Sequence, residues 1–530
     1  MKLFLILFSL AALGFGQTKK IYMFYTNDVH GGIAEVEATF LNPNFPPILG
    51  GGASAAAILS EYRKLAEENG DIFLLFDSGD IFQGTPLGTK TEGRALIEYM
   101  NQVGYTAAAA GNHDFDLGKE VFINLTEQAN FPILAANLVN KESGEPFEYI
   151  KPYVLLEKQG IKIGVFGIST ESTENMSFED HIKGLDFTSE KPAAEKAVAK
   201  LKELGADLII GISHLGLPYN MQEGYEELQE AEAQNEKKES YLNAMELARY
   251  VPGIDVLFGG HIHKGYNEPW VDPVNHTICF QNYGNGGNLG MAILEIDMDT
   301  KSIAGYDLPT RNSGLLLLTH DEYWPDPKMR EAIKAEQAEV EKGFDEVIGI
   351  TEFALTRAQS ESPMNNLICD AMVSASGADF SFTNFGGVRS DLQIGPITPR
   401  DMFKVLPFGN SIVVIRMSGS MLRELIEGKL ERNRSGLAIG GGKIVYEKDA
   451  EDGDKISEFL VKNEELDPDK MYKVAMTDYL AEGNSGLGQL EDVKEENIDR
   501  TGIILREAVT QYILENAPLK IKNDGRWVKK

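Results

Sequence analysis

Five short polar segments of the chain contain residues of the types that commonly bind divalent metal ions in proteins. Histidine is scarce, and five of its eight copies lie in these segments. Carboxylate, amide and imidazole donors together suit borderline ions such as zinc or manganese. The candidate ligands, in chain order, are Asp28, His30, Asp80, Asn112, His214, His261 and His263. Seven donors are enough for two ions with open coordination positions.

Two ions about 4 Å apart that share a carboxylate lower the pKa of bound water and hold the attacking and leaving oxygens of an in-line phosphoryl displacement. We predict Asp80 as the shared carboxylate, because it lies in a glycine-flanked loop. His113 follows Asn112 directly and would not share its direction, so we assign His113 to the transition state. Asp116 would orient the ring of His113 and favour its charged form.

Each polar segment follows a short apolar run, as expected for a loop at the end of a strand. The five runs are Ile21–Tyr25, Ile72–Phe76, Tyr105–Ala110, Leu208–Ile212 and Val256–Phe258. Helical patterns alternate with them at Ala53–Leu65, Gly93–Val103 and Ala193–Leu204. This alternation predicts an α/β domain. Open α/β sheets build their sites at the carboxyl ends of strands, so we expect the five loops to form one site.

The length of 530 residues is too great for one hydrophobic core and predicts two or three domains. Pro325 and Pro327 interrupt the pattern before a charged helix at Lys328–Lys342. We therefore divide the chain into an N-terminal domain (20–325), a linker helix (326–345) and a second α/β domain (346–515). The second domain has strand patterns at Phe380–Phe382, Ile412–Ile415, Ile444–Tyr446 and Tyr472–Met476, helical patterns at Asn366–Ser374 and Met421–Glu427, and a polar tail, Asp524–Lys530, that we expect to fray.

The first sixteen residues predict a cleaved secretory signal. Lys2 precedes an apolar run at Leu3–Leu13. The small residues Gly14 and Gly16 match a cleavage site before Gln17. A buried helix is the alternative. No later segment has the eighteen or so consecutive apolar residues that span a membrane. We therefore expect a soluble protein that is secreted or periplasmic.

The composition limits the partners of the chain. A formal charge of −31 repels phosphate polymers, so we expect no nucleic-acid binding. Cys279 and Cys369 lie in different predicted domains and are interpreted as two separate buried thiols. The acidic segment Glu223–Glu239 is interpreted as a solvated surface helix, with a lid over the site as the alternative. The oligomeric state stays open.

Five strings, TNDVHGG, DSGDIFQGTPLG, AAGNHDFDLG, ISHLG and GGHIH, occur in this order along the first domain. They resemble the calcineurin-like metallophosphoesterases, and most closely the secreted 5′-nucleotidase family. The resemblance implies an N-terminal four-layer αββα sandwich and two divalent metal ions, zinc, manganese or similar. It also implies that the seven candidate ligands hold these ions and that His113 and Asp116 form the catalytic dyad.

The resemblance extends to the second domain. Asn366–Met372, Asn384–Arg389 and Leu406–Asn410 are similar to segments of the family's C-terminal nucleotide-binding domain. In that family two aromatic rings hold the base between them, and the resemblance assigns this role to Phe408 and Tyr479. Stacking on an aromatic ring contributes about 1–3 kcal/mol per base, with little preference among bases.

The same resemblance implies that Asn384 and Arg389 contact base and phosphate, with Arg357 as a further candidate for substrate binding. Arginine forks match phosphate oxygens. One position departs from the family, which commonly has a Gly-Gly-Asp-Gly turn where this chain has Ser485 in place of the aspartate. Ser485 can hydrogen-bond to a ribose but lacks the charge-assisted acceptor. A different sugar, a cyclic nucleotide or a nucleotide-sugar therefore stays open.

The residues and the resemblance together predict an exported dimetal phosphohydrolase, 5′-nucleotidase-like, with a hinge near Lys328–Gly343. Its substrate would be a small-molecule nucleotide, and we expect no transmembrane segment. The alternatives are a UDP-sugar hydrolase and a 2′,3′-cyclic-nucleotide phosphodiesterase/3′-nucleotidase, which the string DIFQGTPLG also resembles. A surface scavenger of nucleotides or metal is the alternative that is not an enzyme.

Overall fold

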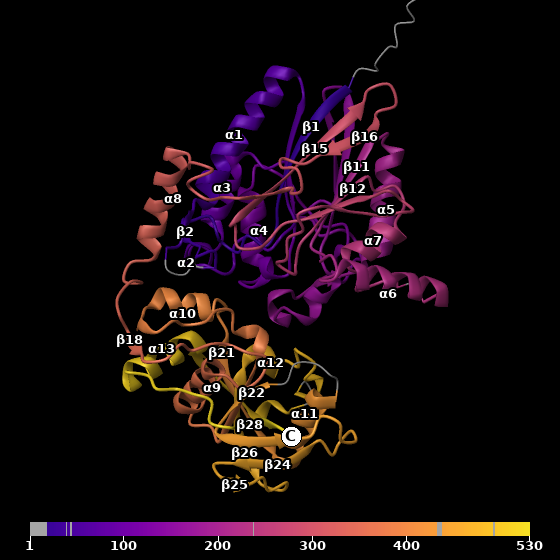
Figure 1. The fold of residues 1–530 in the computed structure, drawn as a ribbon. Helices are drawn as coiled ribbons and strands as arrows, with labels where there is room; N and C mark the ends of the chain where they lie inside the picture. Colours follow the sequence, from indigo (N-terminus) through magenta and orange to yellow (C-terminus); the bar gives the residue numbers. More distant parts are fainter. Residues whose placement is uncertain (1–17, 39, 43–44, 237, 432–436, 491–492) are drawn as a thin grey trace, which may run out of the picture.

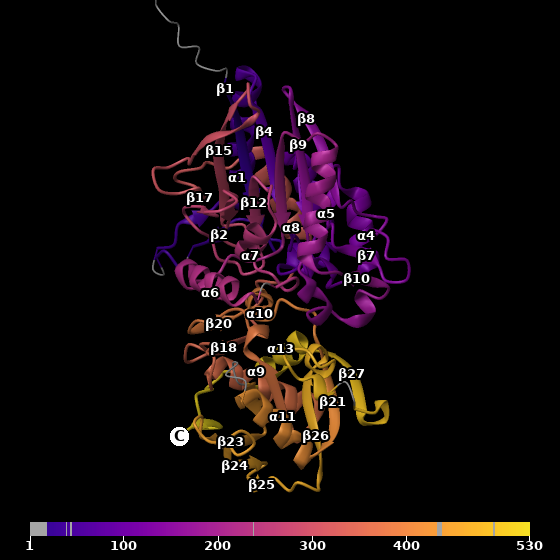
Figure 2. The ribbon, with the colours of Figure 1, turned by 90° about the vertical axis from the view of Figure 1, so that its right-hand side faces the viewer.

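The computed structural model describes residues 18–530 except 39, 43–44, 237, 432–436 and 491–492. The predicted signal, residues 1–16, lies outside the described residues. The chain forms two lobes, one above the other in Figures 1 and 2. Helix α8 (Pro327–Val340) runs along the side of the N-terminal lobe toward the C-terminal lobe (Figure 1).

Two sheets form the centre of the N-terminal lobe. The first has the order β16-β15-β1-β4-β5-β6, with β17 paired to β15, and the second has the order β13-β14-β12-β11-β9-β8. The first sheet contains β1 (Thr18–Thr26), β4 (Ile72–Asp77), β5 (Ala107–Ala109), β6 (Ile133–Leu134), β15 (Asn288–Asp297), β16 (Ser302–Asp307) and β17 (Leu315–Leu317). The second contains β8 (Tyr153–Lys158), β9 (Ile161–Ile168), β11 (Leu208–Ser213), β12 (Val256–Gly259), β13 (Trp270–Val271) and β14 (Ile278–Gln281). The strands that precede the candidate ligands are parallel to their neighbours, β1 to β4 to β5 and β11 to β12. In each sheet their carboxyl ends therefore lie at one edge.

Apolar side chains such as Met23, Leu74, Val165, Ile210 and Phe258 fill the space between the two sheets. The outer face of the first sheet is covered by α1 (Gly51–Asn69), α3 (Arg94–Val103) and α4 (Lys119–Gln128), and that of the second by α5 (Glu190–Glu203) and α7 (Ala244–Tyr250). The layers are helix, sheet, sheet and helix, so the predicted αββα sandwich is confirmed. Shorter elements complete the lobe: α2 (Pro86–Lys90), β2 (Val36–Glu37), β3 (Ile48–Leu49), β7 (Leu138–Asn140) and β10 (Leu185–Phe187).

The acidic segment between His214 and His261 forms helix α6 (Met221–Gln234), which extends from the lobe beside α7 (Figure 1). The side chain of Asn220 begins the helix by accepting hydrogen bonds from the first-turn amides of Gln222 and Glu223. Leu228 is its one buried residue. The prediction of a solvated surface helix is therefore confirmed for Glu223–Gln234, and the described residues of the segment after Gln234 are not helical.

Helix α8 is anchored to the N-terminal lobe by charge. Glu35 accepts hydrogen bonds from Arg330, and its carboxylate lies 2.8 Å from the Lys334 ammonium one turn further on. Burial opposes ionisation of Glu35, but the two cations lower its pKa to about 2. Ile333 adds an apolar contact with the lobe. The helix is therefore held against the N-terminal lobe by ion pairs and an apolar contact.

The C-terminal lobe is built on a five-stranded sheet of order β22-β19-β26-β21-β27. Its strands are β19 (Phe380–Asn384), β21 (Ser411–Ser418), β22 (Leu437–Gly440), β26 (Met471–Thr477) and β27 (Ile498–Ile504). A smaller sheet contains β23 (Gly442–Tyr446), β24 (Ile456–Val461), β25 (Glu464–Glu465) and β28 (Trp527–Lys529), and β18 (Gly349–Thr351) pairs with β20 (Gly395–Ile397). The helices are α9 (Pro363–Ser376), α10 (Pro399–Val405), α11 (Gly419–Glu431), α12 (Asp478–Ala481) and α13 (Leu505–Asn516). Helices α9 and α13 pack on one face of the larger sheet and α11 on the other, so this lobe is also α/β.

The end of the chain is ordered against the C-terminal lobe, and the prediction that it frays is wrong. Strand β28 pairs in parallel with β23. Arg526 donates to Asp370 over 2.7 Å, and Trp527 is buried. The tail is polar on average, but its Arg526 and Trp527 both contact the C-terminal lobe, and the average composition does not indicate these contacts.

Cys279 and Cys369 are both buried free thiols, as predicted. Among the described residues, no helix has the length and apolar character needed to cross a membrane.

Candidate functional site

Five of the seven candidate ligands have an unusual backbone conformation at the ends of their strands. The φ angles of Asp28, His30, Asp80, His261 and His263 are 50°, 49°, 59°, 71° and 56°. Residues other than glycine enter this left-handed region rarely, and each costs on the order of 1–3 kcal/mol unless the surroundings compensate. Five strained residues that meet at one place are typical of a functional site.

Four side chains form a first group of donors. Ligand atoms of Asp28, His30, Asp80 and His263 all lie within 4.8 Å of one another. The Nε2 atoms of His30 and His263 are 3.0 Å apart. The Nδ1 atom of His30 is 2.6 Å from the Gln83 carbonyl, so the imidazole donates there and keeps the Nε2 lone pair for a cation.

A second group of donors surrounds Asn112. Its Oδ1 atom is 3.0 Å from Nε2 of His214 and 3.0 Å from Nδ1 of His261. The Nε2 atom of His214 is also 3.1 Å from Oδ2 of Asp80. The same Asp80 oxygen lies 3.7 Å from Nε2 of His30 in the first group. Asp80 therefore faces both groups, and the structure brings all seven predicted ligands together.

The protonation of His30 and His261 suits a divalent cation. Burial lowers the pKa of His30 to about 4 and that of His261 to about 3. Both imidazoles are thus neutral at pH 7, which is the form that binds metal. Burial opposes ionisation of Asp80, yet His214 and His113 hold its pKa well below the usual range. His214 differs: burial would lower its pKa, but the carboxylates of Asp80 and Asp28 outweigh burial and raise it to about 10, so His214 would have to lose a proton to bind a metal ion.

His113 and Asp116 form a hydrogen-bonded pair at the edge of this cluster. The Nδ1 atom of His113 is 2.8 Å from Oδ2 of Asp116, within the short helix η1 (His113–Phe115) and its cap. The backbone N–H of His113 donates to Oδ1 of Asp80 over 2.8 Å. Burial would lower the pKa of His113, but the carboxylates of Asp116 and Asp80 outweigh it and raise the pKa to about 9. This imidazolium is a proton donor at neutral pH.

Two residues that support the cluster were missed in the sequence. The Asp114 carboxylate accepts hydrogen bonds from the backbone N–H groups of Gly111, Asp80 and Ile81, and so ties the loop after β5 to the loop after β4. Asn27 donates to Asp28 over 2.7 Å and fixes its orientation. The one sequence feature that could have indicated them is that each is next to a candidate residue, Asn27 to Asp28 and Asp114 to His113.

A cavity of about 680 Å³ lies between the lobes and reaches the His113–Asp116 pair. Among the predicted substrate residues, Asn384, Arg389, Phe408 and Tyr479 line it. The Phe408 ring stacks on the His113 ring across the two lobes, with centroids 5.2 Å apart and planes 19° apart. The Arg389 guanidinium lies 5.7 Å from the centre of the Phe408 ring. The His113–Asp116 pair therefore forms part of the wall of this cavity.

Two family models match successive parts of the chain. The calcineurin-like phosphoesterase model matches residues 24–265, and the model of the 5′-nucleotidase C-terminal domain matches residues 340–492. The chain therefore combines a calcineurin-like phosphoesterase domain with a 5′-nucleotidase C-terminal domain. It is therefore a hydrolase, and the calcineurin-like fold of its N-terminal lobe is one that uses a divalent metal ion.

Similarity to individual proteins of the family extends over both lobes. A 5′-nucleotidase of Vibrio cholerae serotype O1 is 27% identical over 547 residues, covering 95% of this chain and 92% of that protein. Protein UshA of Escherichia coli K12 is 26% identical, covering 96% and 94%. The crystal structure of a 5′-nucleotidase precursor from Thermus thermophilus superposes with a TM-score of 0.79 at 25% identity, covering 96% and 99%.

Two predicted substrate residues lie outside the lining of the interdomain cavity. Ser485, which replaces the aspartate common in the family, hydrogen-bonds to the side chain of Tyr479. Arg357 donates to the Val388 carbonyl over 3.3 Å, and its charge lowers the pKa of Arg389 after the larger effect of burial. The direct roles of both residues stay predictions. Met176, Phe178 and His181 of the N-terminal lobe do line the cavity, and no sequence motif marked them.

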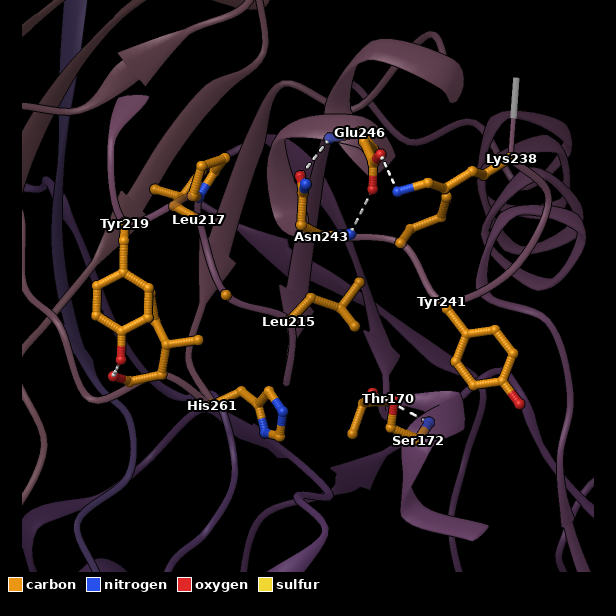
Figure 3. Close-up of a pocket in the computed structure, with 14 residues that line it drawn as sticks. Thr170, Ser172, Leu215, Leu217, Tyr219, Lys238, Tyr241, Asn243, Glu246 and His261 are labelled. Carbon is orange, nitrogen blue, oxygen red and sulfur yellow. Dashed lines mark hydrogen bonds and ion pairs between the residues drawn. The ribbon is translucent and has the colours of Figure 1, made fainter. Parts of the chain in front are cut away.

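A smaller pocket of about 280 Å³ lies on another side of His261 (Figure 3). Leu215, Tyr219 and Tyr241 line it, and Figure 3 shows Leu215 between the two tyrosines. Lys238 reaches it from the segment after α6 and pairs with Glu246 over 2.8 Å. The acidic segment thus helps to build a wall beside the metal-ligand candidates.

Proposed function

We propose that the chain is an exported phosphohydrolase that releases phosphate from 5′-nucleotides with two divalent ions. The observation that carries this proposal is the stacking of Phe408 on His113, where the donor cluster meets the interdomain cavity. A nucleotide whose phosphate lies at the cluster can extend its base into a cavity of about 680 Å³. The relatives named 5′-nucleotidase support the same substrate class.

The two donor groups supply the two metal sites of this proposal. Asp28, His30, Asp80 and His263 would hold one ion, and Asp80, Asn112, His214 and His261 would hold the other. Asp80 is proposed as the bridge because its Oδ2 atom faces both groups. Divalent ions held there supply Lewis-acid chemistry, since they polarise phosphoryl oxygens and favour ionisation of water.

The side chains of the protein perform the remaining work. Hydrolysis breaks the bond between phosphorus and the 5′-oxygen, and the leaving oxygen needs a proton. His113 is proposed to provide it, because Asp116 holds its Nδ1 atom and raises its pKa to about 9 against the effect of burial. Arg389 would bind phosphoryl oxygens, and Phe408 and Tyr479 would hold the base. Asn384 would contact the base edge.

Phosphate release from a panel of substrates tests the proposal. Chelator-treated protein would be supplied with manganese or zinc and then with AMP, 3′-AMP, 2′,3′-cyclic AMP, ATP or UDP-glucose. Metal-dependent release that is fastest from AMP is the expected result, and a His113→Ala variant should lose at least about a hundredfold in rate. Preference for the 3′ or cyclic substrates would assign the chain to the phosphodiesterase/3′-nucleotidase alternative. No release from any substrate would favour a scavenger.

A second candidate function, hydrolysis of nucleotide-sugars, is favoured by the pocket beside His261. Its tyrosines and the hydroxyls of Thr170 and Ser172 are side chains suited to a sugar ring. Tyr241 also has a φ of +54°, a strained conformation at the pocket. A Tyr241→Ala variant that loses activity on UDP-glucose but keeps its activity on AMP would support this function, and parallel behaviour on both would remove it.

Export and the domain division complete the proposal. We expect the mature protein to begin at Gln17 after removal of residues 1–16, which N-terminal sequencing of the protein from culture medium or periplasm would test. The catalytic domain is proposed at 20–325, the linker at 326–345 and the substrate domain at 346–515. The anchored position of α8 favours a hinge in the later part of that linker.

A further inference from the structure

One arginine of the C-terminal lobe holds the loop that carries Phe408. Arg506, in the first turn of α13, donates from Nη1 to the carbonyl oxygens of Leu406, Pro407 and Phe408 over 2.7, 3.3 and 3.4 Å. Its guanidinium also lies 3.5 Å from the centre of the Phe403 ring in α10. A single side chain therefore contacts four residues of α10 and the loop that follows it.

The loop has few other ways to satisfy its backbone. Helix α10 ends at Val405, and the last carbonyls of a helix have no partners within it. Pro407 has no N–H to donate, and Gly409 is exposed. The guanidinium provides the missing donors and places a positive charge at the negative end of α10. Burial lowers the pKa of Arg506 to about 10, so it remains charged at neutral pH.

The position of this loop decides the position of the Phe408 ring. Phe408 is half-buried, and its ring reaches the other lobe to stack on His113 at 5.2 Å. Stacking of a base on an aromatic ring contributes about 1–3 kcal/mol, and a ring that is displaced from the base loses part of that contribution. Whatever fixes the loop therefore acts on substrate through Phe408.

We propose that Arg506 is a positioning residue that sets the Phe408 ring against the substrate and His113 by holding the carbonyls of the 406–408 loop. This inference rests on the proposed function, in which Phe408 stacks on the base. Arg506 itself touches no reacting atom. A lysine at 506 would keep the charge but lose the planar fork and its stacking on Phe403, so charge alone would not replace it.

A double-mutant cycle separates this role from a general structural one. Arg506→Lys, Phe408→Ala and the double variant would be compared for phosphate release from AMP and from ribose 5-phosphate, which has no base to stack. In the parent background Arg506→Lys should raise KM for AMP about tenfold, within the range of one base stack, and leave kcat and the kinetics on ribose 5-phosphate unchanged. In the Phe408→Ala background it should add less than about twofold. Arg416→Lys, an exposed arginine of the same lobe, is the matched control and should behave as the parent.

Equal losses on both substrates, or a full additional loss in the Phe408→Ala background, would overturn the proposal. So would an unchanged KM for AMP. A second readout needs no substrate: a Phe408→Trp reporter should emit at longer wavelength when Arg506→Lys is added, because the ring leaves His113 for solvent. If the parent fails on AMP, the proposed function fails, and the reporter alone decides the role of Arg506. Unchanged emission would then refute it.

Discussion

The Asp114 carboxylate offers the sharpest test of how the metal-ligand loops are held. Its Oδ2 atom accepts from the backbone of Gly111 at 2.8 Å and of Asp80 at 3.1 Å, and its Oδ1 atom accepts from Ile81 at 2.8 Å. An Asp114→Asn side chain has one carbonyl oxygen, so in either orientation at least one buried N–H meets an amide NH₂ instead of an acceptor. An unmet buried donor costs about 1–3 kcal/mol, so we expect the free energy of unfolding to fall by about 2 kcal/mol.

The same change should weaken metal binding, because Asp114 sets the direction of the loop that carries Asp80. Substitutions behind a ligand commonly cost 10- to 100-fold in metal affinity, and we expect about that loss. The assays are urea unfolding of the metal-free protein and calorimetric titration with manganese. Asp299→Asn, at an exposed aspartate of the same lobe, is the control. An Asp114→Asn protein that binds manganese as tightly as the parent would refute the account of the loop.

Three further predictions concern other parts of the molecule. Glu35→Gln should lower stability to urea by about 1 kcal/mol at pH 7. Because the folded-state pKa of Glu35 is lowered to about 2, this difference is present above its unfolded pKa and should vanish as pH falls through 2. Ser485→Asp should leave KM for AMP within about twofold of the parent value, because Ser485 does not line the cavity. A tenfold fall in KM, which corresponds to about 1.4 kcal/mol, would instead indicate that residue 485 contacts the ribose. Removal of metal should lower the melting temperature in calorimetry, since an ion at a hundred times its Kd adds about 2.7 kcal/mol, and an unchanged temperature would count against a folded-state metal site.

Much of the fold could be predicted from the sequence because its signals are local. Apolar runs such as Ile72–Phe76 and Leu208–Ile212 mark buried parallel strands directly, and both lie within β4 and β11. The polar residues after each run then had to meet at one edge of the sheets. The acidic composition likewise predicted a surface helix at α6, and the helix has one buried residue.

The parts that could not be predicted depend on contacts between distant segments. Nothing in the sequence around Asp28 or His261 indicates a left-handed backbone, which only a small fraction of residues other than glycine adopt. Phe178 carries no motif, yet it lines the cavity because the C-terminal lobe lies opposite it. The prediction that the C-terminal tail frays was wrong for a similar reason, because the partner of Arg526 is Asp370, which lies more than 150 residues earlier in the sequence.

The two cysteines give the molecule a surface without reactive thiols. They are the only two in the sequence, one in each lobe, and both are buried. Burial raises the pKa of Cys369 to about 12 and that of Cys279 well above its usual range, so neither forms the thiolate that reacts with maleimides. A cysteine introduced on each lobe would therefore accept spectroscopic labels selectively in the otherwise native chain. The separation of the lobes during turnover is thus open to direct measurement by energy transfer or spin-label distances.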